Sequence, residues 1–185
     1  MEAKRNIRKL AKETRSRMTD EEIATKSERI CQTIWKNSSV QKTKQLLVYA
    51  SIRKEVDLTT LVEYAWKRGI QVCFPKVFGE DMEFYEIKDW QGLAEGAFGV
   101  REPIETAKPV CPDEDAVICV PGVAFSVLGE RIGYGKGYYD RYLSRYPKLY
   151  RIGVGYACQL YESWEAHTLD VGMQLLITEE REIVL

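Results

Sequence analysis

The chain has 185 residues, of which 45% are hydrophobic and 30% charged, and its formal net charge is −1. These values are typical of one globular domain spanning residues 1–185, and they exclude a strong overall field toward nucleic acid or a membrane. The five cysteines have no CxxC spacing and there is one histidine, so we expect reduced thiols, no structural zinc and a cytoplasmic location. We also expect no membrane partner, because no apolar run approaches the ~20 residues of a span and the basic N-terminus lacks a signal segment.

Two helices are predicted at the start of the chain. Apolar residues recur at three- and four-residue spacing over 3–17, which indicates one buried helix face. Thr19 and Glu22 then form a capping-box pattern, and the apolar positions that follow extend the second helix to about Asn37.

A strand, a helix and a second strand follow. The short apolar run 45–50 predicts a buried strand, and 70–75 predicts the next one. Between them, 57–69 has Asp57 as the expected N-cap and Gly69 as the expected stop signal of a helix. This β-α-β order predicts parallel strands with a right-handed crossover.

The second half of the chain continues the alternation. Further strands are expected at 82–87, 116–125, 151–157, 174–178 and 182–185, with a short helix at 137–145 and a long loop over 88–115. Together the elements predict a three-layer α/β/α fold, Rossmann-like, with a mostly parallel central sheet.

The segment GERIGYGKGYYDRYL (129–143) combines alternating glycines with cations and tyrosines. Alternating glycines allow backbone N–H groups to form an anion-binding concavity, and a helix start beyond Gly137 adds the positive end of a dipole. Arg131 and Lys136 supply two cations beside it, and the Asp140 carboxylate is a candidate Mg²⁺ ligand. The alternatives are a simple glycine turn and an Asp140 that pairs with Arg141 or Arg145.

Two other places carry candidate site residues. Lys4 and Arg8 are four residues apart and share one helix face, where they either bind an anion or form a solvated basic face. Glu55 follows the strand at 45–50, where ligands bind in open α/β sheets. It either accepts hydrogen bonds from a polar heterocycle or adds a helix N-terminal charge beside Asp57.

These motifs together resemble the 5-formyltetrahydrofolate cyclo-ligase family, also called methenyltetrahydrofolate synthetase. The resemblance covers most of the chain and rests on five segments: Lys4-x-x-x-Arg8, Ser51-x-x-x-Glu55-Val56, GAFGVREP (96–103), VPGVAFSVLGERIGYGKGYYDRYL (120–143) and LLITE (175–179). It implies that ATP and Mg²⁺ drive the conversion of 5-formyltetrahydrofolate to 5,10-methenyltetrahydrofolate, giving ADP and phosphate.

The resemblance also implies a role for each matching residue. Expected ATP-binding residues are Lys4, Arg8, Arg131, Ile132, Gly133, Tyr134, Gly135, Lys136, Gly137, Tyr138 and Tyr139. Expected folate-binding residues are Ala50, Glu55, Phe98, Tyr134, Gly135, Lys136, Gly137 and Tyr138. Arg131 and Lys136 are the expected catalytic cations, Asp140 the expected Mg²⁺ ligand, and a reduced formylfolate, possibly polyglutamylated, the expected partner of a monomer.

The chain departs from the family pattern near its end. Many members carry H-D-x-x-x-D before the last ITE-type strand, whereas this chain has Leu169, Asp170 and Gln174 at those positions. Gln174 therefore stands where relatives have a second aspartate that can serve the metal. The lone His167 has no expected catalytic role. The alternative function is a non-catalytic relative that binds a nucleotide, a folate or RNA, although no RNA-recognition motif is visible.

Overall fold

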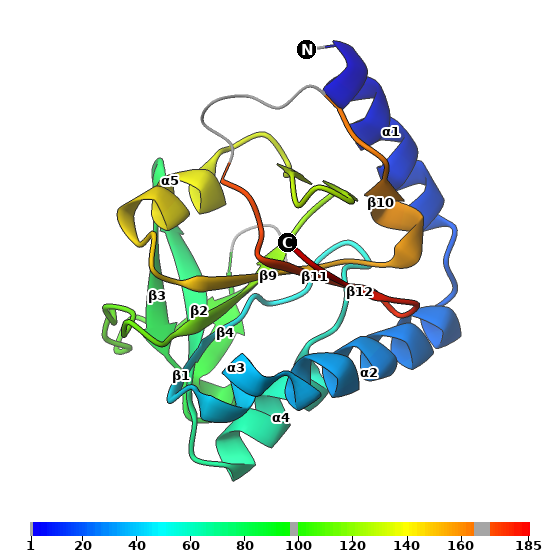
Figure 1. Ribbon diagram of the computed structural model, residues 1–185. Helices are drawn as coiled ribbons and strands as arrows, with labels where there is room; N and C mark the ends of the chain where they lie inside the picture. The colour runs from blue at the N-terminus through cyan, green and yellow to red at the C-terminus, as the bar shows by residue number, and fades with distance from the viewer. Residues whose placement is uncertain (1, 97–99, 165–170) are drawn as a thin grey trace.

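A mostly parallel sheet runs through the centre of the molecule in the computed structural model, which describes residues 2–96, 100–164 and 171–185 (Figure 1). Its strands in spatial order are β12 (Glu182–Val184), β11 (Leu175–Ile177), β9 (Tyr150–Val154), β6 (Val117–Pro121), β1 (Gln45–Leu47), β2 (Gln71–Phe78) and β3 (Asp81–Glu86). The five inner strands pair in parallel, and the two edge strands β12 and β3 pair antiparallel to them. The predicted fold class is confirmed.

Helices cover both faces of this sheet. In Figure 1, α2 (Asp20–Lys36), α3 (Ser38–Lys42) and α4 (Thr59–Lys67) lie below the sheet, and α5 (Tyr138–Arg145) lies above it. Successive strand residues point to opposite faces, so Leu46 joins the core under α2 and α4, whereas Leu47 joins the core under α5. Both side chains are fully buried.

A smaller sheet holds the N-terminal helix. It consists of β10 (Leu160–Tyr161), β7 (Ala124–Ser126) and β8 (Arg131–Ile132), and α1 (Glu2–Ser16) packs against it through Ile7 and Ala11. The sequence predicted one strand over 116–125, but the chain leaves the main sheet after Pro121. At Gly122 an added Cβ would lie 2.6 Å from the Phe125 ring, so glycine is required for this close approach.

The predicted loop over 88–115 contains regular structure that the sequence did not reveal. A 3₁₀ turn, η1 (Trp90–Gly92), leads into a hairpin of β4 (Leu93–Glu95) and β5 (Arg101–Pro103). These strands have three residues each, which is too short for a hydrophobic alternation to be recognised.

Local signals in the sequence predicted most of the helix ends correctly. Gly69 follows α4 with a positive φ of 75°, as its predicted stop role requires. Asp57 is not the N-cap of α4: Leu58 is, and the Asp57 carboxylate accepts hydrogen bonds from the Thr59 N–H and hydroxyl, each within 2.9 Å. The carboxylate thus serves the same helix end from one residue further out.

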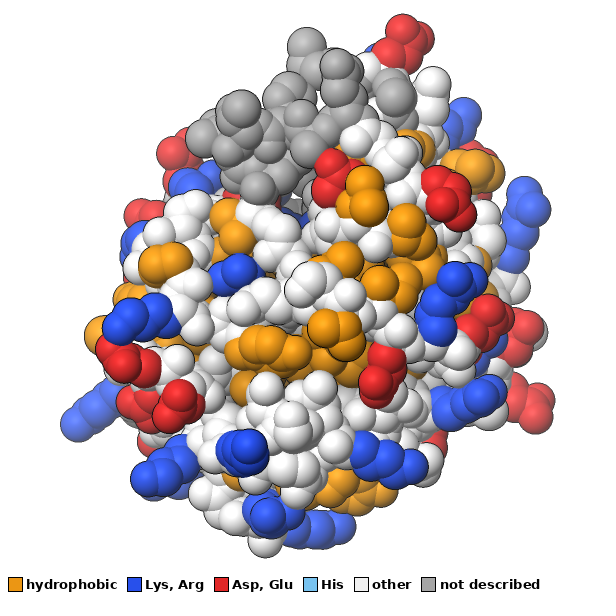
Figure 2. Space-filling model, viewed as in Figure 1, with side chains coloured by type: hydrophobic (Ala, Val, Ile, Leu, Met, Phe, Trp, Pro, Cys, Tyr) orange, Lys and Arg blue, Asp and Glu red, His pale blue; other side chains and the backbone are white. Residues whose placement is uncertain are grey.

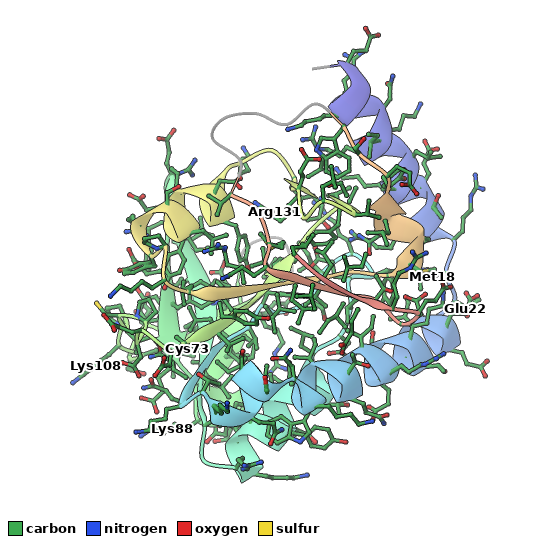
Figure 3. The ribbon with its side chains drawn as sticks, in the orientation of Figure 1. Met18, Glu22, Cys73, Lys88, Lys108 and Arg131 are labelled. Carbon is green, nitrogen blue, oxygen red and sulfur yellow. The ribbon has the colours of Figure 1, made fainter. Side chains whose placement is uncertain are left out.

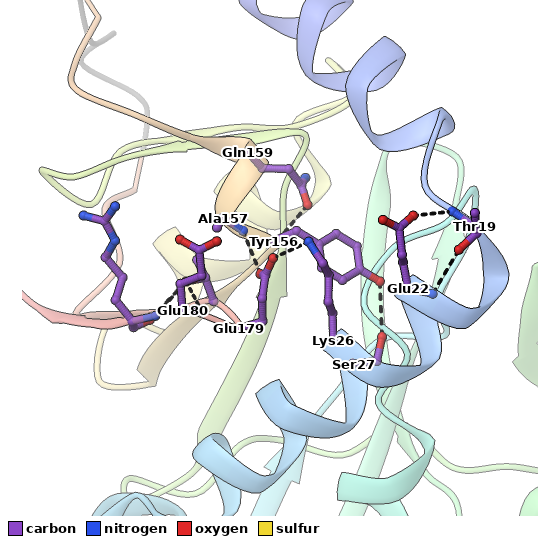
Figure 4. A network of polar contacts seen from close by, with 11 residues as sticks. Thr19, Glu22, Lys26, Ser27, Tyr156, Ala157, Gln159, Glu179 and Glu180 are labelled. Atoms are coloured by element: carbon purple, nitrogen blue, oxygen red, sulfur yellow. Dashed lines mark hydrogen bonds and ion pairs between the residues drawn. The ribbon is translucent and has the colours of Figure 1, made fainter.

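The capping box of α2 is formed as predicted (Figure 4). The Thr19 hydroxyl accepts from the Glu22 N–H at 3.2 Å, and the Thr19 N–H donates to the Glu22 carboxylate at 2.7 Å.

Replacing Thr19 by alanine is expected to lower the free energy of unfolding by about 1 kcal/mol, because the Glu22 N–H in the first turn loses the hydroxyl that accepts from it. Urea denaturation followed by circular dichroism measures this change. Thr25→Ala is the matched control, since Thr25 is exposed within the same helix and alanine there is neutral or slightly stabilising. Equal effects of the two substitutions would contradict the role of the box.

Buried polar contacts fasten α2 to the carboxyl ends of the central strands (Figure 4). The Ser27 and Tyr156 hydroxyls are 3.2 Å apart, and the Tyr156 hydroxyl also donates to the Glu55 carbonyl oxygen at 3.2 Å. Lys26 pairs at 2.7 Å with Glu179, whose other carboxylate oxygen accepts from the Ala157 N–H. Through the Tyr156 hydroxyl, this network holds the backbone carbonyl of Glu55 in place.

Both signs of charge occur on the left and right sides of the face shown in Figure 2, while Lys and Arg side chains predominate along its lower edge. No helix among the residues that the structure describes has the length and apolar character needed to cross a membrane.

Candidate active site

Three chain segments meet beyond the carboxyl ends of β1 and β6. They are α1, the turn that carries Glu55, and the segment from Arg131 to Asp140, which we call the glycine loop. In Figure 3, Arg131 lies between α5 and α1 in the middle of the molecule. The sequence predicted that Arg8, Glu55 and this loop share one site, and the structure brings them together.

The N-terminal helix is tied directly to the glycine loop. The Arg8 Nε donates to the Gly133 carbonyl oxygen at 2.9 Å, and Arg15 Nη2 donates to the Tyr134 hydroxyl at 2.6 Å. Lys4 lies one turn before Arg8 on the same helix. Arg8 and Arg15 therefore face the loop, so the basic face that Arg8 belongs to is not purely solvated.

Glu55 is 6% exposed and sits on a strained turn. Its N–H donates to the Ile52 carbonyl oxygen at 2.9 Å, and the two residues between, Arg53 and Lys54, have positive φ values of 49° and 62°. Residues other than glycine rarely adopt this left-handed backbone conformation. Where they do, the surrounding structure imposes it. Lys54 supplies one restraint, because its ammonium donates to the Ser16 carbonyl oxygen at 3.1 Å, at the end of α1.

The Glu55 carboxylate has a donor on each oxygen. The Tyr134 hydroxyl donates to Oε1 at 2.9 Å, and the Ile52 N–H donates to Oε2 at 3.2 Å. Burial raises the pKa of Glu55, while the charge of Arg15 and these two hydrogen bonds oppose the rise. Burial and the Glu55 charge also raise the pKa of Tyr134 to about 12, so the phenol stays protonated and remains a donor.

Several cations surround the Tyr134 ring. Lys12 Nζ lies 5.0 Å from the ring centroid, the Arg53 guanidinium 5.6 Å and the Arg15 guanidinium 6.0 Å. Partial burial, followed by the charges of Arg8, Arg53 and Arg15, lowers the pKa of Lys12. Arg15 and Arg53 also face the Glu55 carboxylate, and cations in excess of the nearby carboxylate favour an anionic ligand. The sequence reasoning missed Lys12 and Arg15, although both continue the spacing that begins at Lys4 and Arg8.

Arg131 is buried rather than open to solvent. Its Nη2 donates to both carboxylate oxygens of Asp140 at 3.0 Å, its Nη1 donates to the Pro121 carbonyl oxygen at 3.3 Å, and its guanidinium lies 5.5 Å from the Tyr139 ring centroid. The alternative that Asp140 pairs with Arg141 or Arg145 is therefore wrong. Burial raises the pKa of the Tyr139 hydroxyl.

Glycine is needed at two points of the loop. At Gly133 an added Cβ would lie 2.7 Å from Arg131 Nη1, so the backbone approaches the buried guanidinium closely. Gly137 has a φ of 71° and is the N-cap of α5, where no side chain caps the first turn. Gly137 therefore offers no side-chain acceptor to the first-turn N–H groups of α5. The neighbouring Lys136 is exposed.

The other predicted residues are placed as follows. The Tyr138 hydroxyl donates to the Gly79 carbonyl oxygen at 3.1 Å, which ties the loop to the β2–β3 turn, and Ala50 is half-buried after β1. Phe98, His167 and Asp170 lie outside the described residues. Gln174 precedes β11 at the amino end of a parallel strand, and its Oε1 accepts from the Arg151 N–H at 2.9 Å. It is thus on the opposite sheet edge from Glu55.

No three His, Cys, Asp or Glu side chains within 2–96, 100–164 and 171–185 are grouped as a protein-only metal site would need. Asp140 alone still suits Mg²⁺, which is commonly held by one or two carboxylates together with substrate phosphates. Its side chain is 27% exposed, so the carboxylate is reachable from solvent while Arg131 orients it.

Fold and site define an α/β protein whose cationic N-terminal helix and glycine loop enclose a buried glutamate at the carboxyl edge of a parallel sheet. Residues 1–179 match the model of the 5-formyltetrahydrofolate cyclo-ligase family. The chain belongs to this family, which is a family of ligases of folate one-carbon metabolism. The resemblance found in the sequence is confirmed.

Individual relatives agree with this membership. A Schizosaccharomyces pombe protein named "Probable 5-formyltetrahydrofolate cyclo-ligase" is 29% identical over 97% of this chain and 97% of its own. The 5-formyltetrahydrofolate cyclo-ligase of Escherichia coli is also 29% identical, over 72% of this chain and 77% of its own. The solved structure of Aquifex aeolicus 5,10-methenyltetrahydrofolate synthetase is 36% identical, with a TM-score of 0.86, covering 98% of this chain and 92% of that one.

Proposed function

We propose that this protein uses ATP and Mg²⁺ to convert 5-formyltetrahydrofolate to 5,10-methenyltetrahydrofolate, releasing ADP and phosphate. The observation that carries the proposal is the meeting of α1, the Glu55 turn and the glycine loop in a member of this family. A buried carboxylate for a heterocycle and a group of cations for phosphates lie within one hydrogen-bonded unit, joined by Tyr134.

The ATP phosphates bind where positive charge is concentrated. Lys4, Arg8, Lys12 and Lys136 supply cations, and the N-terminus of α5 supplies backbone N–H groups. The remaining expected ATP residues are Arg131 and the other members of the segment from Ile132 through Tyr139, which form the loop beside the phosphates. Support comes from the position of Arg8 on the Gly133 carbonyl, which directs α1 toward the loop.

The folate binds on the Glu55 side of the loop. The Glu55 carboxylate accepts from the N–H groups of the pterin, next to Ala50 and the Tyr134 ring. Residues Gly135 to Tyr138 line the boundary between the two ligands. Phe98 is retained as an expected folate contact, proposed from the family resemblance alone.

The reaction requires the formyl oxygen to become a leaving group. The formyl oxygen attacks the γ-phosphorus of ATP, the bond to ADP breaks, and an iminium phosphate remains. The second folate nitrogen then attacks the formyl carbon, its proton is released, and the C–O bond breaks to give phosphate. Such a transfer depends on positioning and charge neutralisation more than on a protein nucleophile.

Asp140 is the residue that holds Mg²⁺ in this proposal. When bound, the metal neutralises charge on the phosphates being separated. Arg131 keeps the Asp140 carboxylate in place through two hydrogen bonds of 3.0 Å, and Lys136 balances charge on the transferred phosphate from the loop.

Replacing Lys12 by glutamine is expected to weaken ATP binding about three- to tenfold, because one partly desolvated cation leaves the phosphate side of Tyr134. Calorimetric titration with MgATP measures the dissociation constant. Lys9→Gln is the matched control, since Lys9 lies on the same helix with a side chain that is 79% exposed and pairs with Glu13. Equal weakening by both substitutions would indicate only a general charge effect.

The proposed partner is a reduced formylfolate, in a monomer that works in the cytoplasm without nucleic acid or membrane partners. Support for a reducing compartment comes from the free thiols Cys31, Cys73 and Cys119, which are all buried.

The direct test mixes the purified protein with 5-formyltetrahydrofolate, ATP and Mg²⁺ and follows the near-ultraviolet absorbance of the methenyl product. We expect growth of that absorbance only when all three components are present, with one ADP formed per product. Folded protein that binds the folate without producing this absorbance would overturn the catalytic proposal and favour a binding relative.

A further inference from the structure

Arg15 is buried at the end of α1, away from the expected phosphate residues Lys4 and Arg8. It is 3% exposed, and its Nη2 donates to the Tyr134 hydroxyl at 2.6 Å. Its Nη1 is buried and has no hydrogen-bond partner among the described residues. A guanidinium in such surroundings is costly unless an anion nearby compensates it. Glu55 is the buried carboxylate that the Tyr134 hydroxyl connects to it.

A continuous hydrogen-bonded path joins Arg15 to Glu55. Arg15 donates to the Tyr134 hydroxyl oxygen. The Tyr134 hydroxyl in turn donates to Glu55 Oε1, with 2.9 Å between the two oxygen atoms. Donation from Arg15 leaves the hydroxyl proton free for the carboxylate and makes the hydroxyl a stronger donor, because successive hydrogen bonds polarise one another. The path runs from α1 through the glycine loop to the turn after β1, so it appears only in the folded protein.

We propose that Arg15 is a positioning residue for folate binding: acting through Tyr134, it keeps the Glu55 carboxylate charged and in one orientation for the pterin. This proposal rests on the proposed function, because the pterin is taken as the ligand of Glu55 from that function. Each carboxylate oxygen accepts one protein donor, from Tyr134 or from the Ile52 N–H, and each retains a further acceptor position for the ligand.

The charges that face Glu55 come from several elements. Arg15 lies on α1 and Arg53 on the turn, and both favour the ionised carboxylate. Tyr134 donates to the carboxylate. The charge of Glu55 also contributes to raising the pKa of the Tyr49 and Tyr139 phenols. The Tyr156 hydroxyl donates to the Glu55 backbone carbonyl instead.

Arg15 has the largest effect among the groups that lower the pKa of Glu55 against the rise caused by burial. Without Arg15 the pKa of Glu55 rises further, so a larger fraction of the carboxyl is protonated near neutral pH. A protonated Glu55 accepts fewer hydrogen bonds from the pterin. Affinity is therefore lost as pH falls through this higher pKa and is regained as pH rises above it.

The test compares Arg15→Met with Arg15→Lys, which restores a cation and one donor. Binding of 5-formyltetrahydrofolate without ATP is measured between pH 5.5 and 9 by the change in tryptophan fluorescence. For Arg15→Met we expect about tenfold weaker binding at the acidic end, corresponding to a shift of about one pKa unit, and convergence with the parent protein at high pH. In turnover, the loss appears in KM for the folate rather than in kcat, and MgATP affinity is unchanged.

Arg15→Lys is expected to recover most of the affinity. Arg17→Met is the matched control, because Arg17 is exposed just after α1 and should leave every parameter unchanged. A loss of the same factor at every pH, without rescue by lysine, would show that Arg15 only supports packing and would overturn the proposal. Unchanged binding in Arg15→Met would overturn it as well.

A ligand-free measurement separates this proposal from the proposed function. Carbon-13 labelling of glutamate carboxyls reports the titration of Glu55 by NMR, with Glu55→Gln used to assign the signal. We expect the Glu55 pKa to be higher in Arg15→Met than in the parent protein and intermediate in Arg15→Lys. An unchanged pKa rejects the role of Arg15 even if the enzyme is active, whereas absent folate binding by the parent protein rejects only the proposed function. Thermal denaturation shows whether each variant is folded. If Arg15→Met is not folded, the pKa of Glu55 in Arg15→Lys decides the result.

Discussion

Replacing Arg131 by alanine is expected to reduce kcat/KM for the cyclisation at least about 100- to 1000-fold, which corresponds to about 3–4 kcal/mol of transition-state stabilisation. Two losses combine in this variant. A cation with a side chain only 5% exposed disappears from the site, and Asp140 loses the guanidinium that holds both of its carboxylate oxygens at 3.0 Å. The expected Mg²⁺ ligand is then free to turn away from the phosphates.

Steady-state assays over a range of Mg²⁺ concentrations measure this effect, and we expect the Mg²⁺ requirement to rise along with the loss of turnover. Arg131→Lys should recover little, because an ammonium cannot reproduce the planar fork of the guanidinium. Arg145→Ala is the matched control, since Arg145 lies on α5 and pairs with Glu83 at 2.7 Å with a side chain that is 42% exposed. Near-native turnover in Arg131→Ala would refute the assignment of the glycine loop.

Replacing Glu55 by glutamine is expected to weaken folate binding by about 2–4 kcal/mol, or roughly 30- to 1000-fold, because truncating a buried charged hydrogen-bonding group has effects of this size. Glutamine has one acceptor oxygen, so it cannot serve both Tyr134 and the Ile52 N–H while also accepting from the pterin. Affinity for MgATP is expected to change little, because we propose that the phosphates bind on the other side of Tyr134.

The same substitution is expected to leave thermal stability unchanged or to increase it at pH 7–8. The pKa of Glu55 is raised in the folded protein, so its ionisation opposes folding at pH values above that pKa. The cost disappears below the ordinary carboxyl pKa, where Glu55 is neutral in both states. Calorimetric unfolding at pH 4 and pH 8 measures this difference, and folate titration measures the affinity. A variant that loses stability at pH 8 and keeps its affinity would contradict both statements.

The substitutions at Glu55 and Thr19 separate a residue that is proposed to bind the ligand from a residue that supports the fold. Glu55 occupies a strained turn and a buried position that stability alone does not favour. Such conflicts with local preference are expected at functional sites. Thr19, by contrast, satisfies its helix end without contacting the site, and its replacement should affect unfolding without affecting turnover.

Much of the fold was predictable because the signals that specify it are local. The strand–helix–strand unit from Gln45 to Phe78 follows from apolar runs and helix end signals, and so does the parallel pairing of β1 with β2. The break after Pro121 was not predictable. It depends on the packing of Phe125 against Gly122 and on the departure of β7 into a second sheet, which the apolar run 116–125 does not reveal.

The family, the fold class and most of the residues that meet at the site follow from the chain alone, because the order and spacing of Lys4, Arg8, Glu55 and the glycine loop can be recognised in it. How these residues act on one another depends on the tertiary fold. Asp140 pairs with Arg131 nine positions earlier, and Arg15 reaches Glu55 through Tyr134, which lies 119 residues further along the chain than Arg15. Such partners are chosen by the packing of α1 on the small sheet, and burial then makes their charges depend on one another.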